Sequence, residues 1–308
     1  MFSRSGSDAI RNYSIHRRQF RVRPGRSQHN ALDALTVAIT SRKVNWILHA
    51  DMEGFFDAIN HEWLIKFLER RIGDPRILRL IRKWLRAGVS EDGEWSLITV
   101  STPQGAVISP FFANVYLHYV FDLWIQWWRK SCRSDVVLVR YADDFVIGFE
   151  NHSEATACLE ALHTCFARFG LKLHKDKTRL IEFGKYAIAR RERHSESRPE
   201  TFNFPTFTHK CAQTKEHGRF TIHRHSIAKR VRATLQTIKE QLRNRMHRPT
   251  GETGRWFRRV VQGWQNCHAI PSNSHCLCRF VDEITRLWLA VIRRRSQSGR
   301  STWTSARM

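Results

Sequence analysis

A pair of aspartates enclosed by two apolar runs constrains the fold of this chain more than any other feature. Residues 136–139 precede Tyr141-Ala142-Asp143-Asp144, and residues 145–149 follow it. β-Branched and aromatic runs on both sides of a short polar break predict a β-hairpin with the carboxylates at its tip. Adjacent carboxylates beside apolar strands are costly to ionise together, and Mg²⁺ or Mn²⁺ would remove that cost. A solvated Asp-Asp turn is the plain alternative.

The distribution of charge points to a polyanionic partner. The chain has 308 residues, enough for two domains, and a formal net charge of +24. Residues 185–308 hold 26 basic and eight acidic residues, so +18 of the net charge lies there. Such a region is the expected footprint of a phosphate backbone. A membrane surface is the rival partner, but no apolar run approaches the ~18 residues of a membrane span, and no signal peptide pattern opens the chain.

The cysteines favour a reducing compartment. Seven cysteines form no even disulfide framework, which fits an intracellular protein. The Cys and His residues between Cys267 and Cys278 lack the paired spacing of a structural zinc site.

The remaining pattern predicts alternating strands and helices around the hairpin. A buried strand at residues 46–50 leads to Asp51, and a short strand is predicted at 98–102. Predicted helix starts are Ser27, Asn60, Asp74-Pro75, Pro110 and Ser153. A broad apolar side of the 74–85 helix should be buried. Residues 171–174 alternate before a basic turn at 175–179, and residues 185–200 are predicted to be a linker. Strand-like alternation returns at 202–207, and basic amphipathic helices are expected at 227–245 and 274–295.

These elements favour phosphoryl transfer at the hairpin tip. A carboxylate at a strand end, facing two carboxylates on a hairpin, can hold two divalent ions roughly 3.5–4 Å apart. Ions in that arrangement stabilise the attacking and leaving oxygens of an in-line displacement. Most of the catalysis then comes from the metal ions and from holding the reactants in place.

Four motifs in this order resemble the group II intron reverse transcriptases. They are residues 50–57 (ADMEGFFD), 102–110 (TPQGAVISP), 141–144 (YADD) and 170–178 (GLKLHKDKT), and residues 254–273 resemble the family's maturase thumb. The resemblance implies an α+β fold, a right-hand polymerase palm with partial fingers followed by an α-helical thumb. It implies an unmatched segment at 1–22, a palm at 23–200, and a primer grip with a basic thumb at 201–308.

The resemblance also implies a role for individual residues. Asp51, Asp143 and Asp144 would be the catalytic carboxylates, holding two Mg²⁺ ions or, in their place, Mn²⁺. The nucleotide and template pocket would comprise Met52, Phe56, Gln104, Gly105, Ala106 and Lys177. Nucleic acid would be bound by Arg23, Arg26, Lys229, Arg230, Arg232, Lys239, Arg243 and Arg245.

The implied function is RNA-directed DNA synthesis coupled to intron RNA binding and splicing assistance. Its partners would be an intron RNA template, a DNA primer and dNTPs, with no membrane, in a cytoplasmic ribonucleoprotein. The chain departs from the family pattern in several places. It is expected to lack the N-terminal part of the fingers, it has Ala106 where glycine is usual, and it has Pro205-Thr206 in the primer grip. The intact set of three aspartates favours the enzyme, whereas the missing fingers and Pro205 favour the alternative of an inactive RNA-binding maturase remnant, or no function. A different palm enzyme, such as a nucleotide cyclase, would lack the basic C-terminal region.

Overall fold

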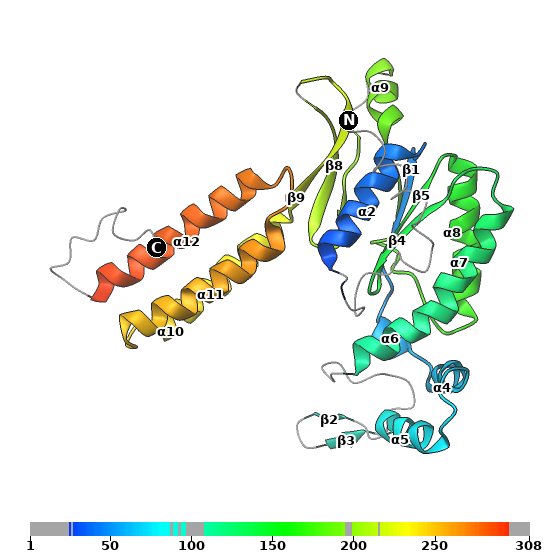
Figure 1. The fold of residues 1–308 in the computed structure, drawn as a ribbon, viewed down its shortest axis with the longest axis horizontal. Coiled ribbons are helices and arrows are strands. Elements are labelled where there is room, and N and C mark those ends of the chain that lie inside the picture. The colour runs from blue at the N-terminus through cyan, green and yellow to red at the C-terminus, as the bar shows by residue number, and fades with distance from the viewer. Residues whose placement is uncertain are drawn as a thin grey trace, which may run out of the picture. The chain divides into compact units, whose positions relative to one another are not determined.

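A computed structural model describes residues 25, 27–86, 89–91, 94–96, 108–194, 199–214 and 216–295. The chain divides into two compact units, residues 1–200 and residues 201–308 (Figure 1). The predicted strand at 98–102 lies outside the described residues. Among the described helices, none combines the length and the apolar character that crossing a membrane requires.

The first unit is built on a four-stranded antiparallel sheet in the order β4-β5-β1-β6. Its strands are β1 (Trp46–Ala50), β4 (Val137–Tyr141), β5 (Asp144–Phe149) and β6 (Arg179–Glu182). The predicted hairpin is confirmed: β4 and β5 pair up to Tyr141 and Asp144, and Ala142 and Asp143 form the two-residue connection. A separate small hairpin consists of β2 (Val89–Glu91) and β3 (Glu94–Ser96).

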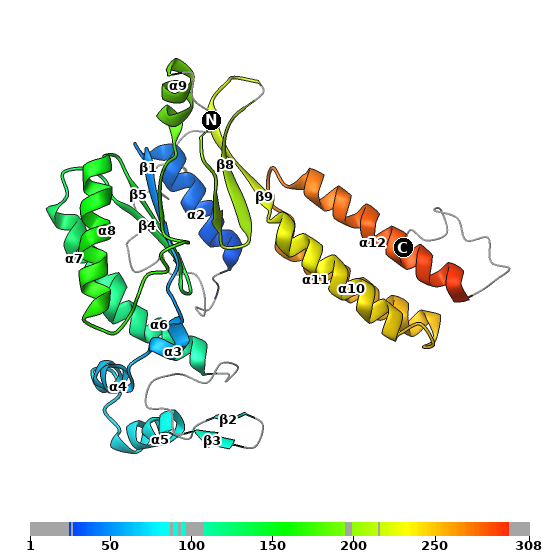
Figure 2. The same ribbon diagram turned by 180° about the vertical axis from the view of Figure 1, so that it is seen from behind.

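Helices cover both faces of this sheet, which explains why its strands are apolar along their whole length. Figures 1 and 2 show α2 on the side of the sheet opposite α7 and α8. Alternate residues Leu48, Phe145 and Ile147 belong to the main hydrophobic cluster, which also takes in the buried sides of α6 and α8. The helical segments are α2 (Gln28–Ser41), α3 (Phe55–Ala58), α4 (His61–Glu69), α5 (Pro75–Arg86), α6 (Ser109–Leu117), the π-helical η2 (His118–Asp122), α7 (Leu123–Trp128), the 3₁₀ turn η3 (Arg129–Ser131), α8 (His152–Ala167) and α9 (Lys185–Arg193).

Three predicted helix starts in this unit are confirmed by their caps. Ser27 closes a capping box with Asn30, Asn60 accepts a bond from the backbone of Trp63, and Asp74 accepts one from the backbone of Arg76. The predicted start at Ser153 is wrong by two residues, because α8 begins at His152 and Asn151 is its N-cap.

Two other predictions about this unit are wrong. Residues 185–200 are not wholly a linker, since α9 occupies 185–193 and buries Ala187 against the unit. The apolar side of α5 is narrower than predicted: Leu78, Ile81 and Leu85 are buried, whereas the other apolar residues of this helix are exposed. Those exposed residues are Ile77, Leu80 and Trp84. The buried three follow the 3–4 spacing of a single stripe, which is the part of the helix that packs.

The second unit joins a three-stranded antiparallel sheet to a helical bundle. Its strands are β7 (Phe202–Phe204), β8 (Phe207–Gln213) and β9 (Phe220–Ser226), and its helices are α10 (Ala228–Asn244), α11 (Thr250–His268) and α12 (Ser274–Arg295). A second hydrophobic cluster, which includes Ile238, Trp264 and Phe280, holds the three helices together. The predicted helices at 227–245 and 274–295 are confirmed, whereas the β8–β9 hairpin was not predicted.

Pro205 lies in a tight turn rather than inside a strand, which corrects the expected continuous strand at 202–207. Phe204 pairs with Phe207, and Pro205 and Thr206 connect them. Proline in a turn removes no ladder hydrogen bond. The Pro205 carbonyl accepts a bond from Arg230 Nη1 at 2.9 Å, so the proline is compatible with this turn.

Gly184 provides a stability prediction for the first unit. A Cβ atom on Gly184 would lie 2.0 Å from the carbonyl oxygen of Val44, because the chain leaves β6 against the start of β1. We expect Gly184→Ala to lower the free energy of unfolding by roughly 2–3 kcal/mol, since the backbone itself must shift. Urea denaturation measures this, with Gly73→Ala as the matched control because a Cβ there meets nothing within 4 Å. Equal stabilities of the two variants would contradict the prediction.

Candidate active site

The register of the sheet brings Asp51 to Asp144. Strand β1 ends at Ala50, which pairs with Phe145 in the antiparallel β1–β5 ladder. If the register continued by one step, Asp51 would lie opposite Asp144, and residues directly opposite each other in a ladder have their side chains on the same face. Asp51 and Asp144 are both half-buried. This register favours the meeting of a strand-end carboxylate with the hairpin carboxylates, which stays a prediction.

The turn that carries Asp143 has an unusual backbone. Ala142 has φ 62°, in the left-handed region that residues with a Cβ seldom adopt. A positive φ at the first central residue suits a two-residue hairpin, whose strands must keep a right-handed twist. Glycine would be the easy choice there, so the alanine is held in this conformation by its surroundings. Asp143 follows it and is half-buried.

The segment after α8 fixes the backbone around Asp51. The amide of His174 donates to the carbonyl of Asp51 at 2.9 Å, and the amide of Glu53 donates to the carbonyl of Lys172 at 3.0 Å. Met52 forms an antiparallel bridge with Leu173 between these two bonds. Residues 171–174 thus extend the sheet beside Asp51 and place the following basic turn close to it.

Lys177 in that turn reaches the carboxylates. Its Nζ lies 2.8 Å from Oδ2 of Asp51, although the lysine side chain is 57% exposed. The hydrogen bond and the negative charge of Asp51 raise the pKa of Lys177, against a small opposing effect of burial. The charges of Asp144 and Asp143 raise the pKa of Lys177 further, each by less than Asp51 does.

The three aspartates fit a divalent cation by the chemistry of their donor atoms. Carboxylate oxygens are the hard ligands that Mg²⁺ and Mn²⁺ prefer. In the described parts of the chain, no three His, Cys, Asp or Glu side chains are already gathered as metal ligands. Asp51 instead faces the Lys177 ammonium, which neutralises part of the charge that would otherwise drive the carboxylates apart.

Two further residues implied for the pocket follow Asp51. Met52 is 5% exposed and packs in the main hydrophobic cluster. Phe56 is half-buried against that cluster, with its ring centroid 5.5 Å from that of Phe55. Arg23, Arg26, Gln104, Gly105 and Ala106 lie outside the described residues.

The cationic residues expected on the second unit lie on and after α10. Lys229, Lys239 and Arg243 are exposed. Others have contacts inside the unit: Arg230 holds the Pro205 carbonyl, Arg232 donates to the carbonyl of Ala228 at 3.3 Å, and Arg245 lies 4.6 Å from the centre of the Trp256 ring. The exposed face of α11 adds Arg255, Arg258 and Arg259, which were not singled out from the sequence.

Sequence reasoning also missed a buried ion pair next to the aspartate turn. Arg140 is 1% exposed, and its guanidinium group binds both carboxylate oxygens of Asp122, at 2.9 and 2.6 Å. The available signal was an arginine at the end of an apolar strand, where an unpaired charge is costly.

The sequence matches the profile of a family described as "Reverse transcriptase (RNA-dependent DNA polymerase)" over residues 7–209. Protein YkfC of Escherichia coli is 27% identical over 224 residues, which cover 60% of this chain and 58% of that protein. Group II intron-encoded protein LtrA of Lactococcus lactis is 36% identical over 113 residues, or 35% of this chain and 18% of LtrA. The chain therefore spans less than two thirds of each of these curated relatives.

A solved structure shares the fold over nearly the whole chain. Apo telomerase from Candida tropicalis aligns with 96% of this chain and 50% of its own, with a TM-score of 0.50 and 13% sequence identity. This similarity agrees with the mixed helix-and-sheet architecture expected from the sequence, a polymerase palm followed by a helical thumb.

Proposed function

Because this chain belongs to the reverse transcriptase (RNA-dependent DNA polymerase) family, we propose that it extends a DNA primer on an RNA template at Asp51, Asp143 and Asp144. The observation that carries the proposal is the β1–β5 register, whose last pair, Ala50 and Phe145, directly precedes Asp51 and directly follows Asp144. The raised pKa of Lys177 supports it, because the hydrogen bond and charge of Asp51 cause most of that shift and the charges of Asp144 and Asp143 add to it.

The side chains of the site have separate tasks in this proposal. Asp51, Asp143 and Asp144 hold two Mg²⁺ ions, which would activate the primer 3′-hydroxyl and neutralise the charge of the leaving pyrophosphate. Lys177 leaves Asp51 for the triphosphate of the incoming dNTP, an exchange of one anionic partner for another. Phe56 limits the space beside the sugar and thereby selects deoxyribonucleotides. Met52, which is buried in the main hydrophobic cluster, supports the part of the pocket formed by Phe56.

Replacing Lys177 tests whether its ammonium group competes with a metal ion for Asp51 or supports metal binding. We expect Lys177→Met to bind Mn²⁺ at most about fivefold more tightly, since an exposed ion pair contributes only up to about 1 kcal/mol. The same variant should show a higher KM for dNTP, because the cation that meets the triphosphate is gone. Calorimetric Mn²⁺ titration and steady-state kinetics measure the two effects. Weaker Mn²⁺ binding in the variant would show that Lys177 supports the metal site instead of competing with it.

The second unit is proposed to hold intron RNA and the primer–template duplex. Residues 201–308 hold 21 basic and five acidic residues, a net charge of +16, and the described cations of α10 and α11 lie on the outer side of a packed helical bundle. A cationic face on a folded support binds a phosphate backbone by releasing counterions. We place this activity in a cytoplasmic ribonucleoprotein, in which the chain also assists splicing of the intron.

The salt dependence of RNA binding tests this face. Lys239 and Arg243 lie four residues apart on α10, so both point to one side. We expect Lys239→Gln/Arg243→Gln to flatten the slope of log K against log salt by about 1.5, at roughly 0.7–0.9 for each phosphate that the variant no longer neutralises. Arg286→Gln is the control, because Arg286 pairs with Glu283 on α12. Equal slopes for the test and control variants would place the RNA elsewhere.

A second candidate function is RNA binding without polymerisation, as an intron folding cofactor. The basic second unit favours it, since that surface needs no metal site to work. Primer extension on an RNA template with Mg²⁺ decides between the two, with RNA affinity measured on the same preparation. Template-dependent extension establishes the polymerase. Tight, salt-dependent RNA binding without any extension would overturn the polymerase proposal and leave the binder.

A further inference from the structure

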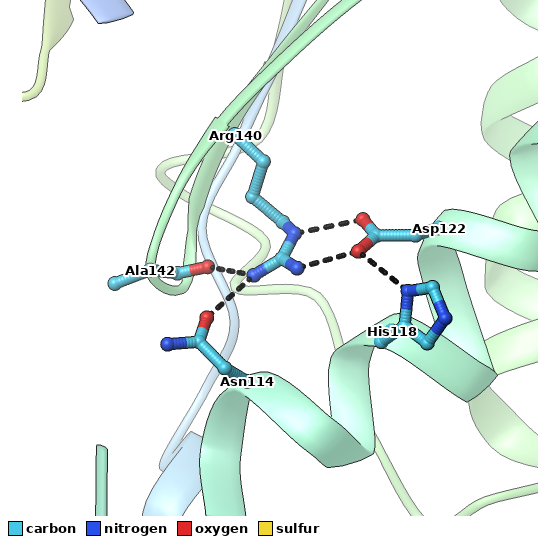
Figure 3. Close-up of polar contacts among 5 residues, drawn as sticks. All are labelled: Asn114, His118, Asp122, Arg140 and Ala142. Carbon is cyan, nitrogen blue, oxygen red and sulfur yellow. Dashed lines mark hydrogen bonds and ion pairs between the residues drawn. The ribbon is translucent and has the colours of Figure 1, made fainter. Parts of the chain in front are cut away.

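Arg140 is a buried cation that makes four hydrogen bonds, one of which reaches the aspartate turn. It lies in β4, one residue before Tyr141, and is 1% exposed. Its Nε and Nη2 bind the two oxygens of Asp122, while its Nη1 donates to Oδ1 of Asn114 at 3.2 Å and to the carbonyl of Ala142 at 2.8 Å (Figure 3). One side chain thus connects a helix to the turn.

The π-helical segment η2 supplies the anchor for this arginine. The amide of Leu123 donates to the carbonyl of His118, five residues earlier, which widens the turn that ends at Asp122. Asp122 also lies 3.5 Å from Nδ1 of His118. Figure 3 shows Asn114, His118 and Asp122 approaching from one helical stretch, with Arg140 between them and the hairpin. π-Turns inside helices are frequently found at functional sites.

The anchored helix is itself packed against the strand that follows the aspartates. The rings of Phe121 and Phe145 have centroids 4.4 Å apart, and both residues are fully buried. Phe145 comes directly after Asp144. The η2 segment therefore contacts the hairpin on both sides of its turn, through Arg140 in β4 and through Phe145 in β5.

The hydrogen bond from Arg140 reaches Ala142, whose backbone lies in the unfavourable left-handed region. Ala142 has φ 62°, and its carbonyl belongs to the peptide group that joins it to Asp143. A donor held by a buried ion pair fixes the plane of that peptide group. The plane in turn sets the direction in which the Asp143 backbone, and hence its carboxylate, leaves the turn.

We propose that Arg140 and Asp122 position the Asp143–Asp144 turn for metal binding. Arg140 is a positioning residue, since it binds a backbone carbonyl and no reacting atom. The proposal rests on the proposed function for the role of the two aspartates. A merely structural pair is the competing explanation. Replacing a buried ion pair by apolar residues of similar size often leaves stability unchanged, so stability and positioning can be separated by mutation.

The test uses the full chain with Arg140→Met/Asp122→Leu, which keeps the volume of the pair and removes the donor to Ala142. Hydrogen exchange of the amides at residues 142–144 and Mn²⁺ affinity are measured together. We expect exchange to be about tenfold faster or more at these amides and Mn²⁺ binding about tenfold weaker, with the melting temperature close to that of the unmutated chain. Arg42→Met is the control, because its partner Asp135 lies at the other end of β4 and is exposed.

The two readouts keep this inference distinct from the proposed function. Exchange and Mn²⁺ affinity that both match those of the Arg42→Met control would overturn the positioning role. If Asp143→Ala leaves Mn²⁺ binding unchanged, the metal site is wrong, and exchange at 142–144 alone decides whether Arg140 holds the turn. Arg140→Lys retains the charge without the planar fork, so full recovery of slow exchange in that variant would also overturn the proposal.

Discussion

Replacing Asp143 with alanine is expected to lower the rate of primer extension by at least about a thousandfold. Loss of one metal-binding carboxylate removes several kcal/mol of transition-state stabilisation, and each 1.36 kcal/mol is a factor of ten. The folded state should be nearly unaffected, with the free energy of unfolding within about 0.5 kcal/mol of that of the unmutated chain, because Asp143 lies in a turn at the edge of the sheet. Single-nucleotide extension and urea denaturation measure the two quantities.

Asp176→Ala is the matched control for this variant. Asp176 is an exposed carboxylate in the turn that holds Lys177, so its removal changes the local charge equally without removing a proposed ligand. RNA affinity should be the same in all three proteins, since binding and chemistry are assigned to different units. Extension by Asp143→Ala at more than about a tenth of the unmutated rate would rule out a metal site that needs this carboxylate.

Replacing Asp122 with asparagine alone is expected to lower the free energy of unfolding by roughly 3–5 kcal/mol. The change removes the counter-ion of Arg140 and leaves a buried charge uncompensated, which is the costly way to break a buried ion pair. Arg140→Met/Asp122→Leu removes both charges and should be close to the unmutated chain. A loss below about 1 kcal/mol for the single variant, the range of exposed ion pairs, would contradict the assignment of this pair as buried and coupled.

The carboxyl group of Asp122 also makes the free energy of unfolding depend on pH. Burial alone would raise the pKa of Asp122, but the charge of Arg140 and hydrogen bonds from His118 and Arg140 outweigh it, so the pKa lies below its ordinary value. A depressed carboxyl pKa contributes stability that is complete above about pH 4 and is lost as the pH falls through the folded-state value. The unmutated chain should therefore lose stability more steeply below pH 4 than Asp122→Asn does. An equal loss of the free energy of unfolding in the two proteins as the pH falls below 4 would contradict this.

Stability and activity are thus expected to respond to two different carboxylates, Asp122 and Asp143, which are linked through Arg140 and Ala142. Asp143 contributes little to folding because it lies in the two-residue turn between β4 and β5. Asp122 contributes much because its charge is buried against a guanidinium group. A variant at either position changes one of the two quantities far more than the other.

The sequence alone determined the local elements of the site. The apolar runs around Tyr141–Asp144 were enough to predict the hairpin, since no other short element has that pattern. The helix caps at Ser27, Asn60 and Asp74 follow from side chains that bond to their own neighbours, so they needed no tertiary information. The family could also be identified from the order and spacing of four motifs. The limits of α9 and the turn at Pro205 were missed, because weakly patterned or mixed segments take their structure from what they pack against.

Tertiary structure decided how those elements meet. Only the antiparallel register pairs Ala50 with Phe145 and so brings the residues next to them, Asp51 and Asp144, to the same end of the sheet. Only the pairing of residues 171–174 beyond β1 brings Lys177 to Asp51. The bond from Arg140 to Ala142 depends on a π-turn that local propensity does not predict. Contacts between residues distant in the chain depend on the whole packed unit, whereas a hairpin or a cap is specified by a few adjacent side chains.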